Sequence, residues 1–331
     1  KKKTEGSTTQ LQKLFSLNTK NKILVYKITD IIKETNIFGE EFVNINKNKL
    51  KLMIEGKEID LCSKYIFNNY GEEVVKIIEK EPITITKKMF YDCENLIEIN
   101  GLSSWNMKIV TDASNMFSFC SRLESIYELE KWDMSNVANT SGMFTGCTSI
   151  TSIQPLKNWN MGNVTDSSYM FAFMPIESLE PLQNWDMSNI IDAHAMFKNC
   201  SAIKSLKHLT NWKWKNVADM SEMFSGCSSI ISLEPLREWD VSTVHDVSEM
   251  FYKCSSINSI NPLENWNIEN ITDGRNMFRG CKALTSLDKL EKWNINTAAY
   301  TSGMFYKCSS IERKVTFNNR KLDDEDNKEM Y

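Results

Sequence analysis

A Met-Phe pair returns at a nearly constant spacing along most of this chain of 331 residues. Successive pairs are 27 residues apart, with a single step of 26. A fixed period of this length is typical of repeat proteins, in which one unit is too small to bury its apolar side alone and therefore stacks on the next. The methionines of these pairs are Met89, Met116, Met143, Met170, Met196, Met223, Met250, Met277 and Met304.

Cysteine follows the same period, one per repeat, except that Met174 stands at the cysteine position of the shortened repeat. A thiol needed for catalysis, a metal or a disulfide could not be exchanged for a thioether, whereas an apolar core residue could. Paired C-x-x-C spacing, which would indicate a zinc site, does not occur. We therefore expect buried, reduced cysteines that pack the core, and no metal site. The periodic cysteines are Cys93, Cys120, Cys147, Cys200, Cys227, Cys254, Cys281 and Cys308.

Each repeat except the first also begins with a tryptophan, from which positions are counted here, with the tryptophan as zero. In the unit that begins at Trp239, Met-Phe-x-x-Cys at +11 to +15 favours a short helix that starts near Asp246. The later apolar residues Ile257, Ile260 and Leu263 favour a short strand and turn. The predicted fold is a repeat solenoid of about nine 27-residue coils, each a short strand plus a short helix, stacked into an elongated, curved rod.

Two polar positions recur beside this apolar pattern. Asparagine is common at +4 and aspartate at +7, as at Asn216 and Asp219. Their side-chain oxygens and amides suit the capping of backbone groups at tight bends. The alternative is a row of aspartates that binds Ca²⁺, although Asn139 and Tyr300 interrupt the row and no Gly-rich Ca²⁺ loop accompanies it.

With these motifs in view, the repeat resembles the BspA-like leucine-rich repeat family, of the DUF285 type found in mycoplasma surface lipoproteins and in many protists. The stretches WDMSNVANTSGMFTGCTSI (132–150) and WDVSTVHDVSEMFYKCSSI (239–257) carry the resemblance. It covers about residues 80–315 and implies a leucine-rich-repeat-like α/β solenoid used for adhesion or protein binding, with no catalytic residues. Departures are Lys213-Trp214-Lys215 in one turn, and His194 and Arg275 in place of serine.

The flanks of the repeats lack the period. Residues 21–78 mix strand-like alternation with polar turns, including IFGEEFVNIN at 37–46, and predict a small β-rich domain of three to five strands that caps the first coil. The predicted organisation is a polar tail (1–20), this N-terminal domain (21–78), the solenoid (79–315) and a charged C-terminal tail (316–331).

Composition restricts the function further. A net charge of −4 gives no case for nucleic acid, no apolar run is long enough for a membrane span, and no phosphate loop or nucleophile–base pair is present. We expect no enzyme activity and no cofactor. The compartment stays open: the resemblance implies a cell surface, whereas unpaired cysteines and the lack of a visible signal peptide favour the cytoplasm.

The function expected is a scaffold that binds a protein partner through exposed, variable positions at +19 and +22, beside the predicted strand on the concave face. An aromatic strip near Met-Phe, with Phe119, Phe173, Tyr252 and Tyr306, is the rival surface. The alternative function is an architectural subunit of a larger intracellular assembly. The candidate partner-binding residues are Glu124, Tyr127, Thr151, Glu177, Glu180, Lys204, Lys207, Ile231, Glu234 and Asn258.

Overall fold

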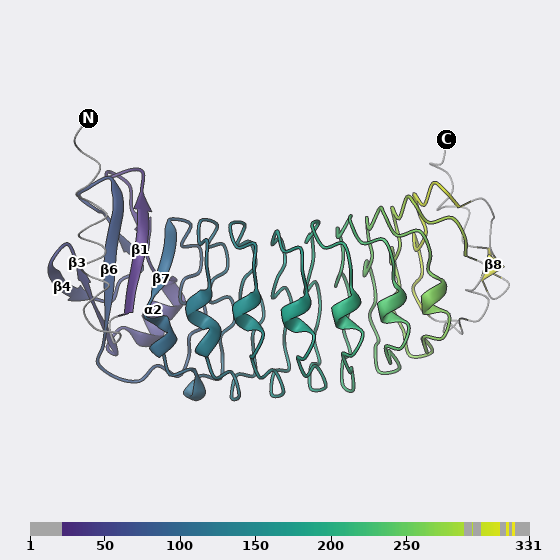
Figure 1. Cartoon of the computed structure of the whole chain (residues 1–331), viewed down its shortest axis with the longest axis horizontal. Helices are drawn as coiled ribbons and strands as arrows, with labels where there is room; N and C mark the ends of the chain where they lie inside the picture. Colours follow the sequence, from purple (N-terminus) through teal and green to yellow (C-terminus); the bar gives the residue numbers. More distant parts are fainter. Residues whose placement is uncertain (1–21, 288–292, 294–298, 312–315, 318–319, 322–331) are drawn as a thin grey trace.

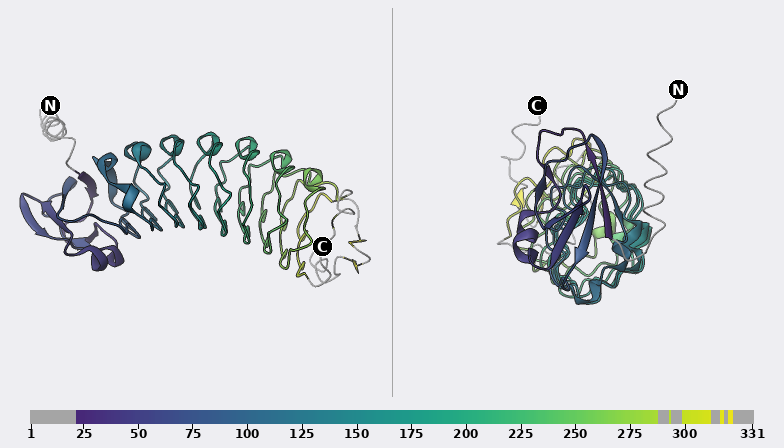
Figure 2. Two further views of the ribbon diagram at one scale, coloured as in Figure 1. Left: turned by 90° about the horizontal axis from the view of Figure 1, so that it is seen from below. Right: turned by 90° about the vertical axis from the view of Figure 1, so that its left-hand side faces the viewer.

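The computed structural model shows an elongated, gently curved stack of coils with a sheet-containing domain at its N-terminal end (Figures 1 and 2). The structure describes residues 22–287, 293, 299–311, 316–317 and 320–321. The predicted polar tail at 1–20 and most of the predicted C-terminal tail lie outside the described residues. Within 316–331 the described part is one two-stranded sheet, formed by β8 (Thr316–Phe317) and β9 (Arg320–Lys321).

The N-terminal domain is built on a five-stranded antiparallel sheet in the order β4-β3-β6-β1-β7, whose edge strand β7 comes from the first coil. Alternating side chains of β3, such as Leu50, Leu52 and Ile54, are buried, as period-two patterning requires. A second, two-stranded sheet pairs β2 with β5. The strands are β1 (Lys22–Ile28), β2 (Thr35–Asn36), β3 (Leu50–Ile54), β4 (Lys57–Asp60), β5 (Lys64–Tyr65), β6 (Gly71–Glu79) and β7 (Leu96–Asn100).

One segment of this domain differs from the prediction. The residues IFGEEFVNIN were read as strand-like, but the last seven of them form the helix α2 (Glu40–Asn46). Phe42 and Asn46, four residues apart on one helical face, are the buried residues, and Glu40 and Glu41 lie in the first turn, where acidic side chains favour a helix. Seven residues are too few for sequence periodicity to separate helix from strand.

The coils are joined by a single line of parallel β-bridges at position +7. Each bridge links a residue to its equivalent one coil further on, so the predicted aspartate row is also the line along which the coils pair. The bridged residues are Ile85, Asp112, Asn139, Asp166, Asp192, Asp219, Asp246, Asp273 and Tyr300. The stacking predicted from the period is confirmed by these pairings.

The Met-Phe segment is a chain of turns rather than the predicted helix. The N–H groups of Asn115 and Phe117 donate to carbonyls of the following coil, at 2.7 and 2.9 Å, whereas the intervening N–H of Met116 donates within its own coil to Ala113 at 3.3 Å. This alternation requires left-handed backbone at Asn115 (φ 54°) and Phe119 (φ 62°), at positions +10 and +14. Because two left-handed residues interrupt it, an α-helix cannot form there. We call the segment from +8 to +15 the turn ladder.

The segment predicted as a strand at +18 to +24 also differs. Only the first coil has a strand there, β7; in the later described coils that segment ends in short 3₁₀ helices, which lie along the outer side of the curve (Figure 2). Proline is the second residue of several of them, as in Pro155 and Pro235, and its missing N–H and fixed φ favour a helical start over a sheet ladder. The 3₁₀ helices of the later coils are η3 (Tyr127–Lys131), η4 (Gln154–Leu156), η5 (Glu180–Leu182), η6 (Lys207–Leu209), η7 (Glu234–Leu236) and η8 (Asn261–Leu263). Two further 3₁₀ helices lie near the first coil: η1 (Leu102–Ser104) follows β7, and η2 (Met107–Ile109) follows Trp105.

The core is a continuous aromatic stack that runs through the coils. The Phe224 ring lies 5.7 Å from that of Phe197 and 5.8 Å from that of Phe251, nearly parallel to both. The repeat tryptophans line the same core. From Trp132 to Trp293, each repeat indole N–H donates to the backbone carbonyl of an earlier leucine, as Trp239 does to Leu209 at 3.0 Å. The periodic Met, Phe, Trp and Cys residues of the described coils are therefore structural.

The N-terminal domain closes the first end of this stack. The Phe38 ring lies 5.5 Å from that of Phe90, extending the aromatic stack into the domain. The N–H of Gly39 donates to the Met89 carbonyl at 3.0 Å, and the Asn46 side-chain amide donates to the Ile85 carbonyl at 3.3 Å. The domain thus supplies donors to carbonyls of the first coil, as a cap of a repeat stack must.

Replacing Gly39 by alanine is expected to lower the free energy of unfolding by about 1–3 kcal/mol, the usual cost of overpacking. Its backbone (φ −65°) suits any residue, but a Cβ would lie 2.0 Å from the Lys88 carbonyl oxygen, so the cap must move off the coil. Urea unfolding measures the change. Gly162→Ala is the matched control, because its Cβ meets only the Asn160 side chain, at 3.2 Å, and Asp186. Equal effects of the two variants would contradict the role of Gly39 as a close-contact residue.

Candidate functional site

All ten predicted partner-binding residues are exposed. Residues at +22, such as Tyr127 and Glu234, begin the 3₁₀ helices, and those at +19 precede them by three residues. Tyr127 and Ile231 are large exposed side chains, at 69% and 53% of their full surface. The expected placement beside a strand on the concave face is wrong, because the 3₁₀ helices run along the outer side of the curve (Figure 2). We call the two sets of residues the outer rows.

A constant serine at +20 explains why these rows keep their spacing. Its hydroxyl accepts the N–H of the +22 residue, as Ser232 does from Glu234 at 3.2 Å and Ser178 from Glu180 at 3.2 Å. The side chains at +19 and +22 are left to vary. Arg237, hydrogen-bonded to Glu234, holds the pKa of that carboxyl below its usual value.

The rival aromatic residues lie on the turn ladder. Phe119 and Phe173 are 43% and 44% exposed, but they do not form one strip, since Gly146 lies between them. The Phe119 ring covers that glycine: a Cβ on Gly146 would approach the ring to 2.7 Å. Tyr252 and Tyr306, near the other end, are partly buried.

The polar residues at +4 and +7 cap backbone groups, as one of the two readings predicted. The Asn216 amide donates to the Ser188 carbonyl of the preceding coil at 2.9 Å. The Asp219 carboxylate accepts the N–H of Ser221, two residues on, at 2.8 Å. Half-burial raises the pKa of the equivalent Asp192 carboxyl, with its neighbours Asp166 and Asp219 acting in the same direction. Among the described residues, no cluster of three or more His, Cys, Asp or Glu is arranged to hold a metal ion.

The periodic cysteines are free thiols that are buried, as packing residues should be. They also make a contact that sequence reasoning missed: from Cys120 to Cys308, each periodic thiol faces a phenylalanine carbonyl of the preceding coil, as Cys227 Sγ does Phe197 O at 3.1 Å. Burial raises the pKa of Cys200 to about 12 and that of Cys308 to about 11. Such thiols stay protonated near neutral pH and are poor nucleophiles.

His194 forms a polar cluster that the sequence did not predict. Its Nδ1 lies 2.6 Å from Ser221 Oγ and its Nε2 lies 2.8 Å from the Tyr169 hydroxyl, while Lys198 and Glu222 form an ion pair beside it. Both ring nitrogens are therefore engaged, and Ser221 is 5% exposed. The only signal in the sequence was histidine in place of serine. The cluster tethers neighbouring coils and leaves no free base.

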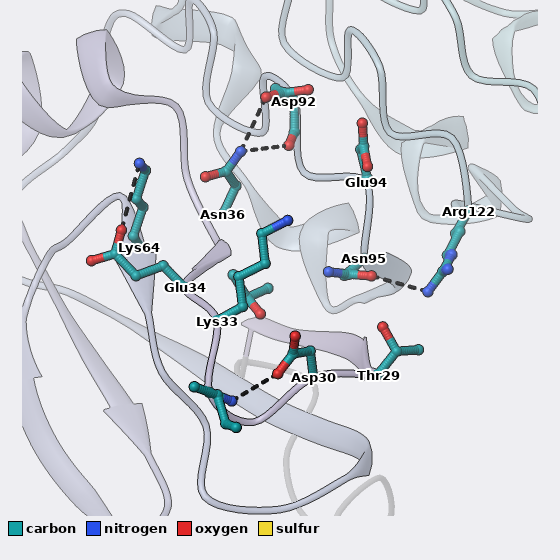
Figure 3. A pocket seen from close by; sticks show the side chains of 12 residues that line it. Thr29, Asp30, Lys33, Glu34, Asn36, Lys64, Asp92, Glu94, Asn95 and Arg122 are labelled. Atoms are coloured by element: carbon teal, nitrogen blue, oxygen red, sulfur yellow. Dashed lines mark hydrogen bonds and ion pairs between the residues drawn. The ribbon is translucent and has the colours of Figure 1, made fainter.

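A polar pocket of about 760 Å³ lies where the N-terminal domain meets the first coils (Figure 3). Asn36 binds the backbone and carboxylate of Asp92 across it, and Lys33 extends into the space (Figure 3). Both acidic and basic side chains line it. Its walls come from segments far apart in the sequence, which is why no motif marked it. The lining residues are Thr29, Asp30, Ile32, Lys33, Glu34, Thr35, Asn36, Lys64, Asp92, Glu94, Asn95 and Arg122.

No helix in the described part of the chain is long and apolar enough to cross a membrane. Comparison with known families gives two matches. The family model described as "Mycoplasma protein of unknown function, DUF285" matches residues 84–208, 172–288 and 202–319, and that described as "BspA type Leucine rich repeat region" matches residues 32–131. No curated protein and no solved structure matches the chain.

Proposed function

Because the chain belongs to the DUF285 family of BspA-type leucine-rich repeat proteins, we propose that it is a non-enzymatic scaffold that binds a protein partner, in adhesion at a cell surface, through its outer rows. The observation that carries the proposal is the contrast within each coil. The apolar residues, the serine at +20 and the polar residues at +4 and +7 recur in most coils, whereas the exposed side chains at +19 and +22 change from coil to coil.

The architecture supports such a role energetically. The outer rows stand on 3₁₀ helices whose leucines, such as Leu209 and Leu236, are fully buried in the core. A surface fixed in this way loses little conformational entropy when a partner binds. Neighbouring coils carry opposite charges, as at Glu177 and Lys204, so a partner can be selected by charge complementarity.

The test is a charge exchange that leaves the net charge unchanged. Partners captured by the immobilised chain from extracts of the source cells and of the cells they contact are identified and purified, and the Kd of each is measured for the wild type and for Glu177→Lys with Lys204→Glu. We expect the exchange to weaken binding of a true partner at least about tenfold, or about 1.4 kcal/mol.

The matched control is Lys215→Glu with Glu238→Lys, two exposed residues outside the outer rows. This exchange is expected to leave the Kd within about twofold, a change of under 1 kcal/mol. Loss of binding in the control but not in the outer-row variant would refute the outer rows as the contact surface. Partners found only among intracellular assembly proteins would favour the architectural alternative instead.

A further inference from the structure

Three cations line the C-terminal part of the turn ladder on successive coils. Lys253, Arg279 and Lys307 occupy positions +14, +13 and +14. Their backbones adjoin, since the N–H of Lys253 donates to the Arg279 carbonyl at 2.7 Å and that of Gly280 to the Tyr306 carbonyl at 2.8 Å. Stacked core rings of these coils lie 5.4 and 5.5 Å apart, which gives the spacing from one coil to the next.

Tyrosine rings hold these cations in place. The Lys253 amino group lies 4.9 Å from the Tyr252 ring, while the Arg279 guanidinium and the Lys307 amino group lie 4.6 and 5.1 Å from the Tyr306 ring. A cation resting on a ring keeps its outward side open to an anion. Lys253 also passes over Gly280, where a Cβ would be 3.5 Å from its stem.

The described carboxylates do not neutralise the three cations. Within the described ranges, none of them has an acidic oxygen within 4.0 Å, and the Arg279 guanidinium donates only to the Asn276 amide oxygen, at 3.4 Å. The nearby acidic side chains have other partners: Asp273 pairs with Arg275, and Glu249 accepts from Asn276 at 3.4 Å. Lys253 and Lys307 are exposed, and Arg279 is half-buried.

The same positions in the N-terminal coils have no such charge. There, +13 and +14 hold Ser118 with Phe119, Thr145 with Gly146 and Ala172 with Phe173. In the middle of the ladder, Lys198 at +13 is paired with Glu222. The cations that lack such a partner therefore lie at the C-terminal end of the described turn ladder, on a part of the coil distinct from the outer rows. Arginine and tyrosine are, with tryptophan, the residues enriched at the energetic centres of protein interfaces.

We propose that Lys253, Arg279 and Lys307, with Tyr252 and Tyr306, form a second docking site for an acidic, extended segment of a protein partner. Alternate side chains of an extended chain point the same way about 6.6 Å apart, close to the coil spacing, so carboxylates at i, i+2 and i+4 can each meet one cation. The tyrosine rings supply apolar contact that a purely ionic ligand would not use.

A fluorescein-labelled peptide of five Glu-Ser repeats, titrated with the full chain at about 50 mM salt, tests the site. Saturable binding is expected, with loss at about 500 mM salt because the contacts are exposed ion pairs. Substituting Lys253→Gln, Arg279→Gln and Lys307→Gln together should weaken binding at least about tenfold. A Gln-Ser peptide of the same length should not bind.

The control triple is Lys157→Gln, Lys213→Gln and Lys215→Gln, which removes the same charge from exposed positions outside both the turn ladder and the outer rows. It should leave binding within about twofold. Equal loss in both triples, or no saturable binding by the wild type, would overturn the proposal. So would heparin binding that depends on the three cations while the acidic peptide does not bind, since the ligand would then be a sulfated polysaccharide. Because the outer rows are a different surface, failure of this proposal would not affect the proposed function, and failure of the proposed function would not affect this proposal.

Discussion

Raising the pH from about 9 to about 11 is expected to unfold this protein over a narrow interval, because its buried thiols can ionise only when the chain opens. Folding raises the pKa of the periodic cysteines from the ordinary 9.0, to about 11 for Cys308 and about 12 for Cys200, and burial is the main cause. Below the unfolded pKa the thiols are protonated in both states, so the stability is fully present. It is lost as the pH rises toward the folded values.

Each such thiol lowers the free energy of unfolding by about 1.4 kcal/mol per pH unit within that interval. Several together exceed the net stability of an ordinary domain, roughly 5–15 kcal/mol. Urea unfolding under reducing conditions at about pH 8, 9 and 10 measures the slope. Replacing Cys227, which is fully buried, by alanine should reduce that slope by the share of one thiol.

The control for this prediction is Cys62→Ala. Cys62 lies in the N-terminal domain and is half-buried, so its smaller pKa rise should contribute less to the slope. Lysine and tyrosine titration is common to all three proteins and cancels in the comparison. A Cys227→Ala slope equal to that of the wild type would show that the thiols do not carry the alkaline instability.

Phe224→Ala should lower the free energy of unfolding by about 3–5 kcal/mol, the usual cost of removing a buried phenylalanine. The ring is fully buried, lies between those of Phe197 and Phe251, and also contacts Trp239 at 6.4 Å. Because coils contact only their neighbours, the cavity cannot be filled from elsewhere in the stack. Calorimetry or urea unfolding gives the change.

Phe305→Ala is the matched comparison near the C-terminal end. Phe305 stacks on Phe278 at 5.5 Å and is only partly buried, so its loss should cost less than that of Phe224. An effect below about 1 kcal/mol for Phe224→Ala would mean that the Met-Phe segment is not the core.

The sequence was sufficient to predict the stack and its core but not the local conformation of a coil. Recurrence of the apolar residues Met, Phe and Cys identified buried positions, because equivalent positions of stacked coils line the same core. Phe at +12 and Cys at +15 also suit a helix, and only the left-handed residues at +10 and +14 rule it out. Position +10 holds residues as different as Asn115, Gly142 and Tyr169, so the residue type does not predict the left-handed conformation.

The candidate sites, like the fold, could be predicted from the sequence only in part. The exposure of the outer rows could be predicted from the apolar residues at fixed positions beside them. The side of the curved rod on which they lie could not, because the curvature depends on how whole coils pack. The cap contacts of Gly39 and the pocket at Lys33 join segments about 50 or more residues apart, which no local pattern encodes. Single replacements, such as His194 for serine, marked a new contact without revealing its partner.

The alternating hydrogen bonds of the turn ladder give the rod a direction. Every cross-coil N–H of that ladder aims toward the C-terminal end, as from Asn115 to Ser141, and the carbonyls at the opposite end receive their donors from Gly39 and Asn46. A whole coil inserted or removed in the middle would present the same donors and acceptors at both joins. The length of the rod can therefore change in steps of roughly 5 Å, the spacing of neighbouring strands, while its terminal contacts stay as they are. The length of the rod and the residues that recognise a partner can thus evolve separately in such a protein.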